Sequence, residues 1–372
     1  MNSNSKYSLV IDARMINVSG IGTVCQNIIP DLLKDFNVTL MGNPEELKEF
    51  SWAKNLGIIS LTSQIYSLQE QMELFFKVPA YDYFLSPHYN VPFLPVKAKK
   101  RIVIIHDVNH IALENNFNIL KKIYARLFIK LALTKSDKIF TVSRFSKSEI
   151  IKYFEVIDAS IHPLVLGVNT EIFKVFSSKE QDQIRTRYEL PRHFLLYVGN
   201  VKPHKNLSTL IKAFAILKAT RSLVPYKLVI VGKKEGFITS DQAISKEINA
   251  LNLLNDIIFT GFVPNEDLPG LYNLASLFVF PSLYEGFGLP PLEAMACGCP
   301  TVVSDASSLP EVCQNASLYF NPKNPEELAA VITKVLQDKT LQDQLRTSGF
   351  NLVKQYDWKL TAQAIKEVIL AK

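Results

Sequence analysis

The sequence predicts an α/β fold with two doubly wound parallel sheets, and three observations carry this prediction. Apolar runs such as 195–199 and 228–232 lack alternation, which is typical of parallel strands covered on both faces. Single stretches of helix length separate most of these runs, so the strands belong to βαβ units. The rhythm stops in a polar, loop-rich passage at 167–192 and then starts again, which divides the 372 residues into two domains.

Ten segments have the β-rich composition of strands. They lie at 7–13, 36–42, 81–87, 101–107, 138–143, 193–200, 227–232, 257–262, 276–282 and 300–305. We place the domains at 1–175 and 176–355, and we expect a last amphipathic helix at about 356–372 to pack back on the first domain. Functional residues are then expected just after strands, because open α/β sheets bind ligands at the carboxyl ends of their strands.

Composition narrows the class of protein. Apolar residues make up 48% and charged residues 20%, and the net charge of +6 is too small to indicate nucleic-acid binding. Without a membrane-length apolar run or a secretory signal at its start, the chain is expected to be cytoplasmic. The four cysteines fit a reducing compartment, and Cys297 and Cys299 lack the second ligand pair that a zinc site needs.

The densest motif lies at 279–300, where a buried strand passes through a glycine turn into a helix that begins near Pro290. Glu285 lies in the turn and Glu293 eight positions further, in what we expect to be the first helical turn. Such a helix start can hold an anion. An acid there also complements the helix dipole without any ligand, so both interpretations stay open from the residues alone.

Three further segments carry polar residues after strands. In 197–214, Lys202, His204 and Lys205 precede a helix that Asn206 or Ser208 could cap, which would make either a phosphate pocket or an ordinary solvated loop. Gly20 and Gly22 form half of a dinucleotide fingerprint, which equally suits a packed turn. His106 ends the strand at 101–107, where it could stabilise charge with Asp107 orienting its ring.

Together these segments resemble the retaining, nucleotide-sugar-dependent glycosyltransferases of family four, which have the two-Rossmann-domain GT-B fold. The resemblance covers nearly the whole chain in the expected order, and the glutamate pair of 279–300 is its most specific part. The segments that carry it are 19–24, 105–108, 141–147, 166–173, 197–207, 259–275 and 281–305. The residues at 204–207 and 105–108 are most similar to those of bacterial mannosyl- and rhamnosyltransferases of surface-polysaccharide assembly.

The resemblance implies a role for each matching residue. His106, Lys205 and Glu285 are the implied catalytic residues, with His106 near the anomeric centre and Lys205 on the distal phosphate of the donor. The other implied donor contacts are Gly20 and Gly22 at the diphosphate, Gly261, Phe262 and Val263 at the base, Glu285, Gly286, Phe287 and Gly288 at the sugar hydroxyls, Leu289 at a phosphate and Glu293 at the ribose.

The chain departs from the family at the second phosphate-binding cation. Many relatives have arginine just after the glycine at 199 or just before the lysine, where this chain has Asn200 and His204. The second phosphate-binding cation is therefore His204 or Lys202, or it is absent. Because no Asp-x-Asp follows a strand, we expect no metal and no cofactor besides the nucleotide-sugar co-substrate, for which GDP-mannose is favoured.

The resemblance implies sugar transfer with retention to a glycan or lipid-linked acceptor in surface-polysaccharide synthesis. Rhamnosyl or UDP-hexosyl transfer is the alternative within the family. A sugar-nucleotide 2-epimerase shares the architecture, and a non-catalytic nucleotide-sugar-binding protein is the alternative from another class. An NAD-dependent oxidoreductase fits poorly, because the third glycine and the acid about twenty residues on are missing.

Basic charge is concentrated in one part of the first domain. Residues 97–152 contain thirteen Lys or Arg and four Asp or Glu, a net charge of +9, so the rest of the chain is net negative. Within this part, 119–135 predicts an amphipathic helix with Lys122, Arg126 and Lys130 on one face and Leu120, Tyr124, Leu127 and Leu131 on the other. A peripheral contact with an anionic membrane surface, on the inner face of the cytoplasmic membrane, is one interpretation, and a core-packed helix is the other.

Overall fold

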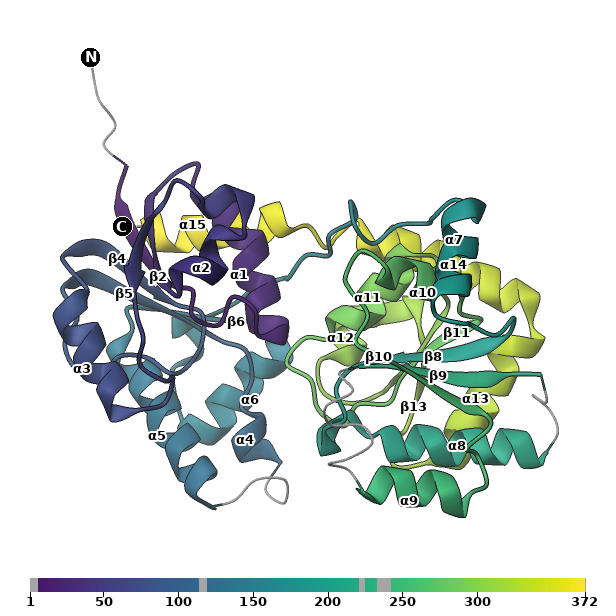
Figure 1. Ribbon diagram of the computed structural model, residues 1–372. Helices are drawn as coiled ribbons and strands as arrows, with labels where there is room; N and C mark the ends of the chain where they lie inside the picture. Colours follow the sequence, from purple (N-terminus) through teal and green to yellow (C-terminus); the bar gives the residue numbers. More distant parts are fainter. Residues whose placement is uncertain (1–5, 114–118, 221–224, 233–241, 372) are drawn as a thin grey trace. The chain divides into compact units, whose positions relative to one another are not determined.

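A computed structural model describes residues 6–113, 119–220, 225–232 and 242–371. The chain divides into two compact units (Figure 1). Unit 1 comprises 1–167 and 357–372, and unit 2 comprises 168–356. Each unit is a parallel sheet with helices on both faces, as the sequence predicts.

In the described residues of unit 1, seven parallel strands follow the order β3-β2-β1-β4-β5-β6-β7. The strands are β1 (Ser8–Asp12), β2 (Asn37–Gly42), β3 (Gly57–Ser60), β4 (Tyr81–Ser86), β5 (Ala98–Ile105), β6 (Lys138–Thr141) and β7 (Ile161–Pro163). The helices are α1 (Ser19–Leu32), α2 (Pro44–Lys48), α3 (Leu68–Lys77), α4 (Asn109–Ala112), α5 (Ile119–Lys135), α6 (Arg144–Phe154) and α15 (Trp358–Leu370), with 3₁₀ turns at Ser51–Ala53 and Asp158–Ser160.

In the described residues of unit 2, six parallel strands follow the order β10-β9-β8-β11-β12-β13. The strands are β8 (Phe194–Val198), β9 (Lys227–Val231), β10 (Ile257–Gly261), β11 (Leu277–Phe280), β12 (Thr301–Ser304) and β13 (Leu318–Phe320). The helices are α7 (Ser178–Arg187), α8 (Leu207–Ala219), α9 (Gln242–Ala250), α10 (Leu268–Leu274), α11 (Leu289–Ala296), α12 (Leu309–Cys313), α13 (Pro325–Gln337) and α14 (Lys339–Val353), with 3₁₀ turns at Pro203–Lys205 and Gln314–Ala316.

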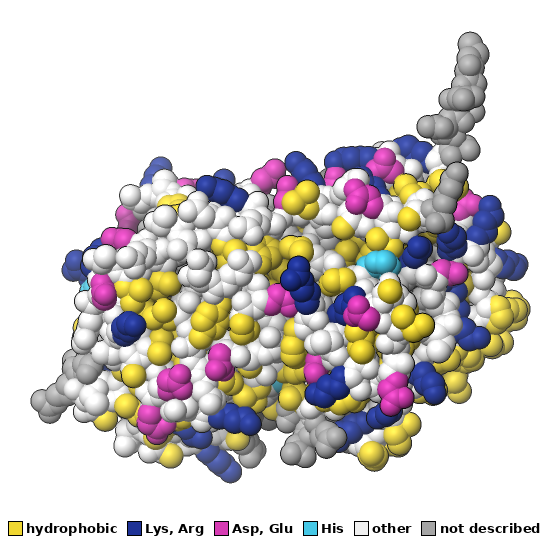
Figure 2. All heavy atoms as spheres, turned by 180° about the vertical axis from the view of Figure 1, so that it is seen from behind, with side chains coloured by type: hydrophobic (Ala, Val, Ile, Leu, Met, Phe, Trp, Pro, Cys, Tyr) yellow, Lys and Arg dark blue, Asp and Glu magenta, His cyan; other side chains and the backbone are white. Residues whose placement is uncertain are grey.

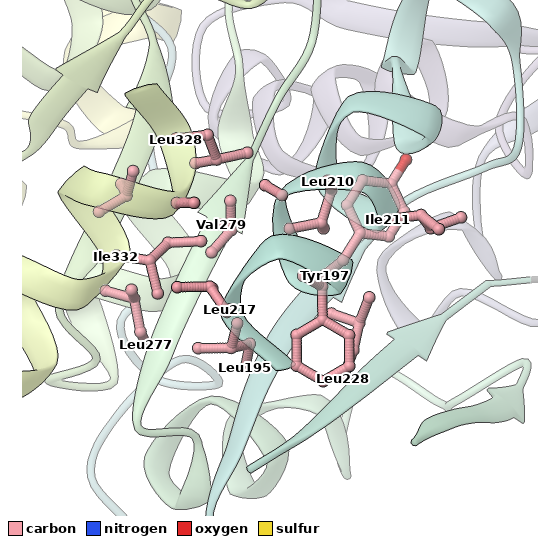
Figure 3. Packing of buried hydrophobic residues seen from close by; sticks show 14 of the residues in the cluster. Leu195, Tyr197, Leu210, Ile211, Leu217, Leu228, Leu277, Val279, Leu328 and Ile332 are labelled. Atoms are coloured by element: carbon pink, nitrogen blue, oxygen red, sulfur yellow. The ribbon is translucent and has the colours of Figure 1, made fainter. Parts of the chain in front are cut away.

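A dry apolar core fixes the central strands of unit 2 (Figure 3). Leu195 of β8 and Leu277 of β11 are fully buried and pack with residues of α8 and α13, among them Leu217 and Ile332. The two strands are direct neighbours, with Leu195 opposite Leu277 in the ladder. Consequently the loops that follow β8 and β11 leave the sheet side by side, and these loops carry Lys205 and Glu285.

The last helix, α15, belongs to unit 1 and packs against α1. The hydroxyl of Thr361 donates to the carbonyl of Val165, and Lys366 pairs with Asp35 at 2.8 Å. Close to the point where the chain passes from unit 1 to unit 2, Gly167 lies so near Trp358 that an added Cβ would meet its backbone nitrogen at 2.2 Å. A side chain at Gly167 would therefore push α15 away.

The structure adds elements that the sequence pattern does not reveal. The short strands β3, β7 and β13 lie at sheet edges, where few residues pair and no long apolar run is needed. Helix α7 lies in the passage that we expected to be loop. Its start carries a capping box, in which Ser177 and Glu180 satisfy each other's backbone N–H groups, and this pattern could have predicted the helix.

Helix α5 exists as predicted. Of its predicted apolar face, Leu120 and Leu127 are 73% and 54% exposed, so this face is not the one that packs on the core. The residues that bury α5 are instead Ala125, Phe128, Ile129, Ala132 and Leu133. The helix has more apolar positions than the core needs, so spacing alone could not identify the buried stripe. None of the helices described has both the length and the apolar character that crossing a bilayer requires.

Candidate functional site

Lys205 and Glu285 form an ion pair at the carboxyl ends of β8 and β11. The Lys205 Nζ donates to Glu285 Oε1 at 2.7 Å, and their side chains are 18% and 12% exposed. The ammonium also lies 5.3 Å from the ring centroid of Phe280, the last residue of β11. A half-buried cation held by one carboxylate is placed where it can meet an anionic ligand without leaving its loop.

The turn after β11 is held from the loop that follows β12. The Glu285 N–H donates to the Ser307 hydroxyl at 2.9 Å, and the Ser308 hydroxyl donates to the Phe287 carbonyl at 2.7 Å. These bonds hold the backbone from Glu285 to Phe287. Ser307 and Ser308 were not predicted as site residues, although small polar residues directly after a buried strand are a signal that could have found them.

Gly288 is required by the geometry of this turn. Its φ is +101°, and an added Cβ would lie 2.6 Å from the Leu309 side chain. Helix α11 begins at the next residue, and no described side chain caps it. Since Pro290 and Pro291 lack an N–H, the amide of Leu289 is the donor that the helix start presents to an anion.

Glu293 lies beyond the first turn of α11, not within it as expected. Its Oε2 accepts a hydrogen bond of 3.2 Å from the Tyr272 hydroxyl of α10. Burial raises the pKa of the Glu293 carboxyl to about 7, and the tyrosine bond offsets only part of this shift. An acid kept half-protonated near neutral pH becomes a stronger acceptor when ligand hydroxyls donate to it. Tyr272 was not predicted, since a buried aromatic residue on a helix reads as core.

The loop after β8 is built differently from the sequence expectation. Asn206 does not cap α8; its side-chain amide donates to the carbonyls of Pro281 and Pro322 at 3.0 and 2.7 Å. It thereby ties this loop to the end of β11. His204 is buried and its carbonyl accepts the N–H of Leu283, whereas Asn200 and Lys202 are exposed.

The residues implied for the base lie at the end of β10, the edge strand whose last residue is Gly261, and directly after it. Gly261 has a φ of +76°, Phe262 is 65% exposed and Val263 is buried. An exposed aromatic ring beside a turn offers a flat apolar surface, which a planar ring system could stack on.

The remaining candidates belong to unit 1. His106 follows β5, its Nε2 lies 3.0 Å from the Pro87 carbonyl, and burial lowers its pKa to about 4. The Asp107 carboxylate accepts the N–H of Asn109.

Gly20 and Gly22 lie in the first turn of α1 and not in a preceding loop. An added Cβ at Gly20 would meet nothing within 4 Å. At Gly22 it would lie 2.2 Å from the carbonyl oxygen of Ile16.

A buried charge cluster beside His106 escaped the sequence prediction. Arg14 pairs with Asp12 at 2.5 Å and with Glu70 at 2.6 Å; the Arg14 and Glu70 side chains are 7% and 0% exposed, and that of Asp12 is 13% exposed. The hollow beside them has both polar and apolar walls. It is lined by Asp12, Arg14, Met15, Ile65, Ser86, Pro87, His88 and Asn90. Glu70 lies far from Arg14 in the sequence, so only the fold brings the cluster together.

No group of three His, Cys, Asp or Glu side chains within the described ranges could hold a metal ion. All four cysteines are buried, as expected for Cys297 and Cys299, and burial raises the pKa of each thiol. Their thiols therefore stay protonated and pack as small apolar groups.

Two parallel-sheet Rossmann-like units, with a lysine–glutamate pair and a glycine turn into a helix, define the class of GT-B glycosyltransferases. The family model described as "Glycosyl transferases group 1" matches residues 178–352. The chain is 32% identical over 275 residues to "O-antigen chain mannosyltransferase B" of Escherichia coli, covering 73% of this chain and 71% of that protein. The chain therefore belongs to the group 1 glycosyltransferases, and the resemblance to family four is confirmed.

Two further comparisons bear on length and fold. "Serotype-specific mannosyltransferase WbdA" of Escherichia coli is 34% identical over 61% of this chain, but the match spans only 28% of that longer protein. The solved structure of a sucrose-phosphate synthase from Thermosynechococcus elongatus superposes with a TM-score of 0.77 over 98% of both chains at 18% identity. This likeness establishes the GT-B fold, which the sequence predicted.

Proposed function

We propose that this chain transfers a hexosyl group, with mannose from GDP-mannose favoured, to a glycan or lipid-linked acceptor in surface-polysaccharide synthesis. The observation that carries the proposal is the Lys205–Glu285 pair beside the uncapped start of α11. The mannosyltransferase names of the relatives support the choice of sugar and of the polysaccharide product.

Charge development in the reaction explains the arrangement. Breaking the bond between sugar and phosphate leaves negative charge on the diphosphate, and the Lys205 ammonium and the Leu289 N–H stabilise it. When a phosphate takes over the ammonium, the Glu285 carboxylate is released to accept sugar hydroxyls. Two contacts therefore form together when the donor binds, and no metal is needed to neutralise the leaving group.

Other residues of unit 2 bind the ribose and the base of the donor. The Glu293 carboxylate accepts the ribose hydroxyls, and its raised pKa means that donor binding releases a proton below about pH 7. Phe262 offers its exposed ring to the base.

We assign the acceptor to unit 1. The resemblance implies that His106 of this unit lies near the anomeric centre, where an acceptor must approach. His106 stays neutral at pH 7 because its pKa is low, so it takes part as a hydrogen-bonding group and not as a cation. Without a base assigned to the acceptor, we propose front-face transfer with retention, in which the leaving phosphate accepts the acceptor's proton.

The test is product analysis with a panel of donors. The chain is incubated with GDP-mannose, dTDP-rhamnose or UDP-glucose and a lipid-linked oligosaccharide acceptor, with and without EDTA, and the product's anomeric configuration is determined by NMR. We expect α-mannoside formation from GDP-mannose, unchanged by EDTA. Rhamnosyl or glucosyl transfer, an inverted product, EDTA inactivation reversed by magnesium, or an epimerised nucleotide sugar would each contradict the corresponding part of the proposal.

A further inference from the structure

Unit 1 exposes two neighbouring apolar stripes on helices α3 and α5. On α3 the exposed residues recur at helical spacing on one face, while Glu70, Gln71 and Leu74 bury the other. On α5 the first two turns are exposed and apolar, because the core takes up a different set of residues. We name these residues the α3–α5 surface: Leu68, Met72, Phe75, Phe76, Ile119, Leu120, Ile123 and Leu127.

The two helices are linked through Tyr66, just before α3, and through Asn90. The ring of Tyr66, two residues before α3, makes an edge contact with the ring of Tyr124 in α5 at 5.6 Å between centroids. The Tyr124 hydroxyl donates to Asn90, whose amide in turn donates to the buried carboxylate of Glu70. The start of α3 is therefore held beside the middle of α5, and the stripes occupy adjoining parts of unit 1.

The apolar residues of the α3–α5 surface are not isolated exposed side chains but form groups of highly exposed neighbours. Leu68, Phe76 and Leu120 are 80%, 71% and 73% exposed, and each has exposed apolar neighbours at helical spacing. Figure 2 shows exposed hydrophobic and basic side chains side by side over much of the face that it presents. Contiguous exposed apolar side chains are typical of a surface that another apolar phase covers.

The charge of α5 identifies what covers it. The helix carries five Lys or Arg and no Asp or Glu. Within the described residues, Lys122, Arg126 and Lys130 take part in no ion pair, whereas Lys147 and Lys152 of the next helix do. A lipid bilayer with anionic headgroups is negatively charged at its surface and apolar beneath it. Exposed apolar side chains can insert into such a bilayer while the neighbouring cations, which have no acidic partner among the described residues, contact the headgroups.

We propose that the α3–α5 surface docks unit 1 on an anionic lipid bilayer, with the apolar side chains of both helices in the acyl boundary and Lys122, Arg126 and Lys130 at the headgroups. Both parts of the surface are needed. A charged protein partner would match the lysines but leave Leu68, Phe76 and Leu120 in water, and a second copy of this chain would bring equal positive charges together. The proposal does not depend on which sugar the chain transfers.

The test is sedimentation of the full chain with vesicles. Phosphatidylcholine vesicles that contain phosphatidylglycerol should carry the protein down at low salt, pure phosphatidylcholine should not, and added salt should release it. The charge variant Lys122→Gln/Arg126→Gln/Lys130→Gln and the apolar variant Leu68→Ser/Phe76→Ser/Leu120→Ser should each lower partitioning about tenfold or more.

A matched control separates this surface from general charge. The variant Lys334→Gln/Lys339→Gln/Lys354→Gln removes the same charge from exposed positions of unit 2 and should bind like the wild type. All variants should keep the wild-type melting temperature. The proposal is wrong if wild type stays in the supernatant with anionic vesicles at low salt, if the control loses as much binding as the charge variant, or if the apolar variant binds unchanged. It is also wrong if light scattering shows a dimer that only the apolar variant dissociates.

Discussion

Each unit holds a cluster of opposite charges at the carboxyl edge of its sheet, and the two clusters are closed to different degrees. In unit 1, Arg14 is held by two carboxylates and enclosed to 7% exposure. In unit 2, Lys205 is held by Glu285 alone, and both side chains keep some contact with water. A guanidinium with two acidic partners is already neutralised, whereas an ammonium with one can exchange that partner for a phosphate. The first cluster therefore secures the fold, and the second is available for chemistry.

The largest effect that tests this comparison is a loss of stability on substitution of Arg14. Arg14→Ala leaves the carboxylate of Glu70, which is fully buried, without its cation, so the free energy of unfolding should fall by about 3–5 kcal/mol. Urea denaturation followed by circular dichroism measures this. In the double variant Arg14→Met/Glu70→Gln much of the loss should be recovered. A loss below about 1 kcal/mol in Arg14→Ala would show that the cluster is not a closed structural one.

For Lys205 the effect should appear in activity more than in stability. Lys205→Ala removes the cation that faces the leaving diphosphate, so kcat should fall about 10²–10³-fold, as on removal of one transition-state donor. The melting temperature should fall less than in Arg14→Ala, because Lys205 is paired with one carboxylate that keeps some contact with water, whereas Arg14 is also paired with the fully buried Glu70. Lys212→Ala, which removes an exposed lysine paired with Glu247, is the matched control and should be fully active. An active Lys205→Ala enzyme would remove the basis of the proposed function.

The pH dependence of donor binding sharpens the comparison at Glu293. The carboxylate is the form that accepts ribose hydroxyls, and its pKa in the free protein is about 7. The dissociation constant of GDP should therefore fall about tenfold from pH 6 to pH 8, with proton release at the lower pH. Calorimetry in buffers of different ionisation enthalpy measures both quantities. Glu293→Gln should bind more weakly and show a flat profile; an unchanged slope in this variant would assign the titration to another group.

The smallest effects are expected at the two glycines of α1. Gly22→Ala pushes a methyl group into the Ile16 carbonyl and should cost about 1–3 kcal/mol of stability. Gly20→Ala meets open space and should stabilise the helix by up to about 1 kcal/mol. If Gly20 serves the donor diphosphate, the stabilised Gly20→Ala protein should nevertheless bind GDP more weakly than wild type. Equal affinity in a thermal-shift titration would limit both glycines to a structural role.

The sequence by itself determined the alternation of strands and helices, because buried parallel strands need unbroken apolar runs that few other structures tolerate. It also determined which loops carry polar side chains, including Lys205 and Glu285, since these follow strands directly. It could not show the edge strands β3, β7 and β13, which are too short to form a pattern. Helix α7 was visible only through its capping box.

Only the tertiary structure decided which of these residues meet. Lys205 and Glu285 are eighty positions apart and become partners because β8 and β11 pair in the sheet. Glu70 of α3 reaches Arg14 in the turn after β1 only through the fold of unit 1, and Tyr272 of α10 reaches Glu293 of α11 only through the packing of two helices. The face that α5 buries was likewise undecided by its sequence, because a helix with apolar residues on several sides turns toward the core according to what the neighbouring elements leave to be filled.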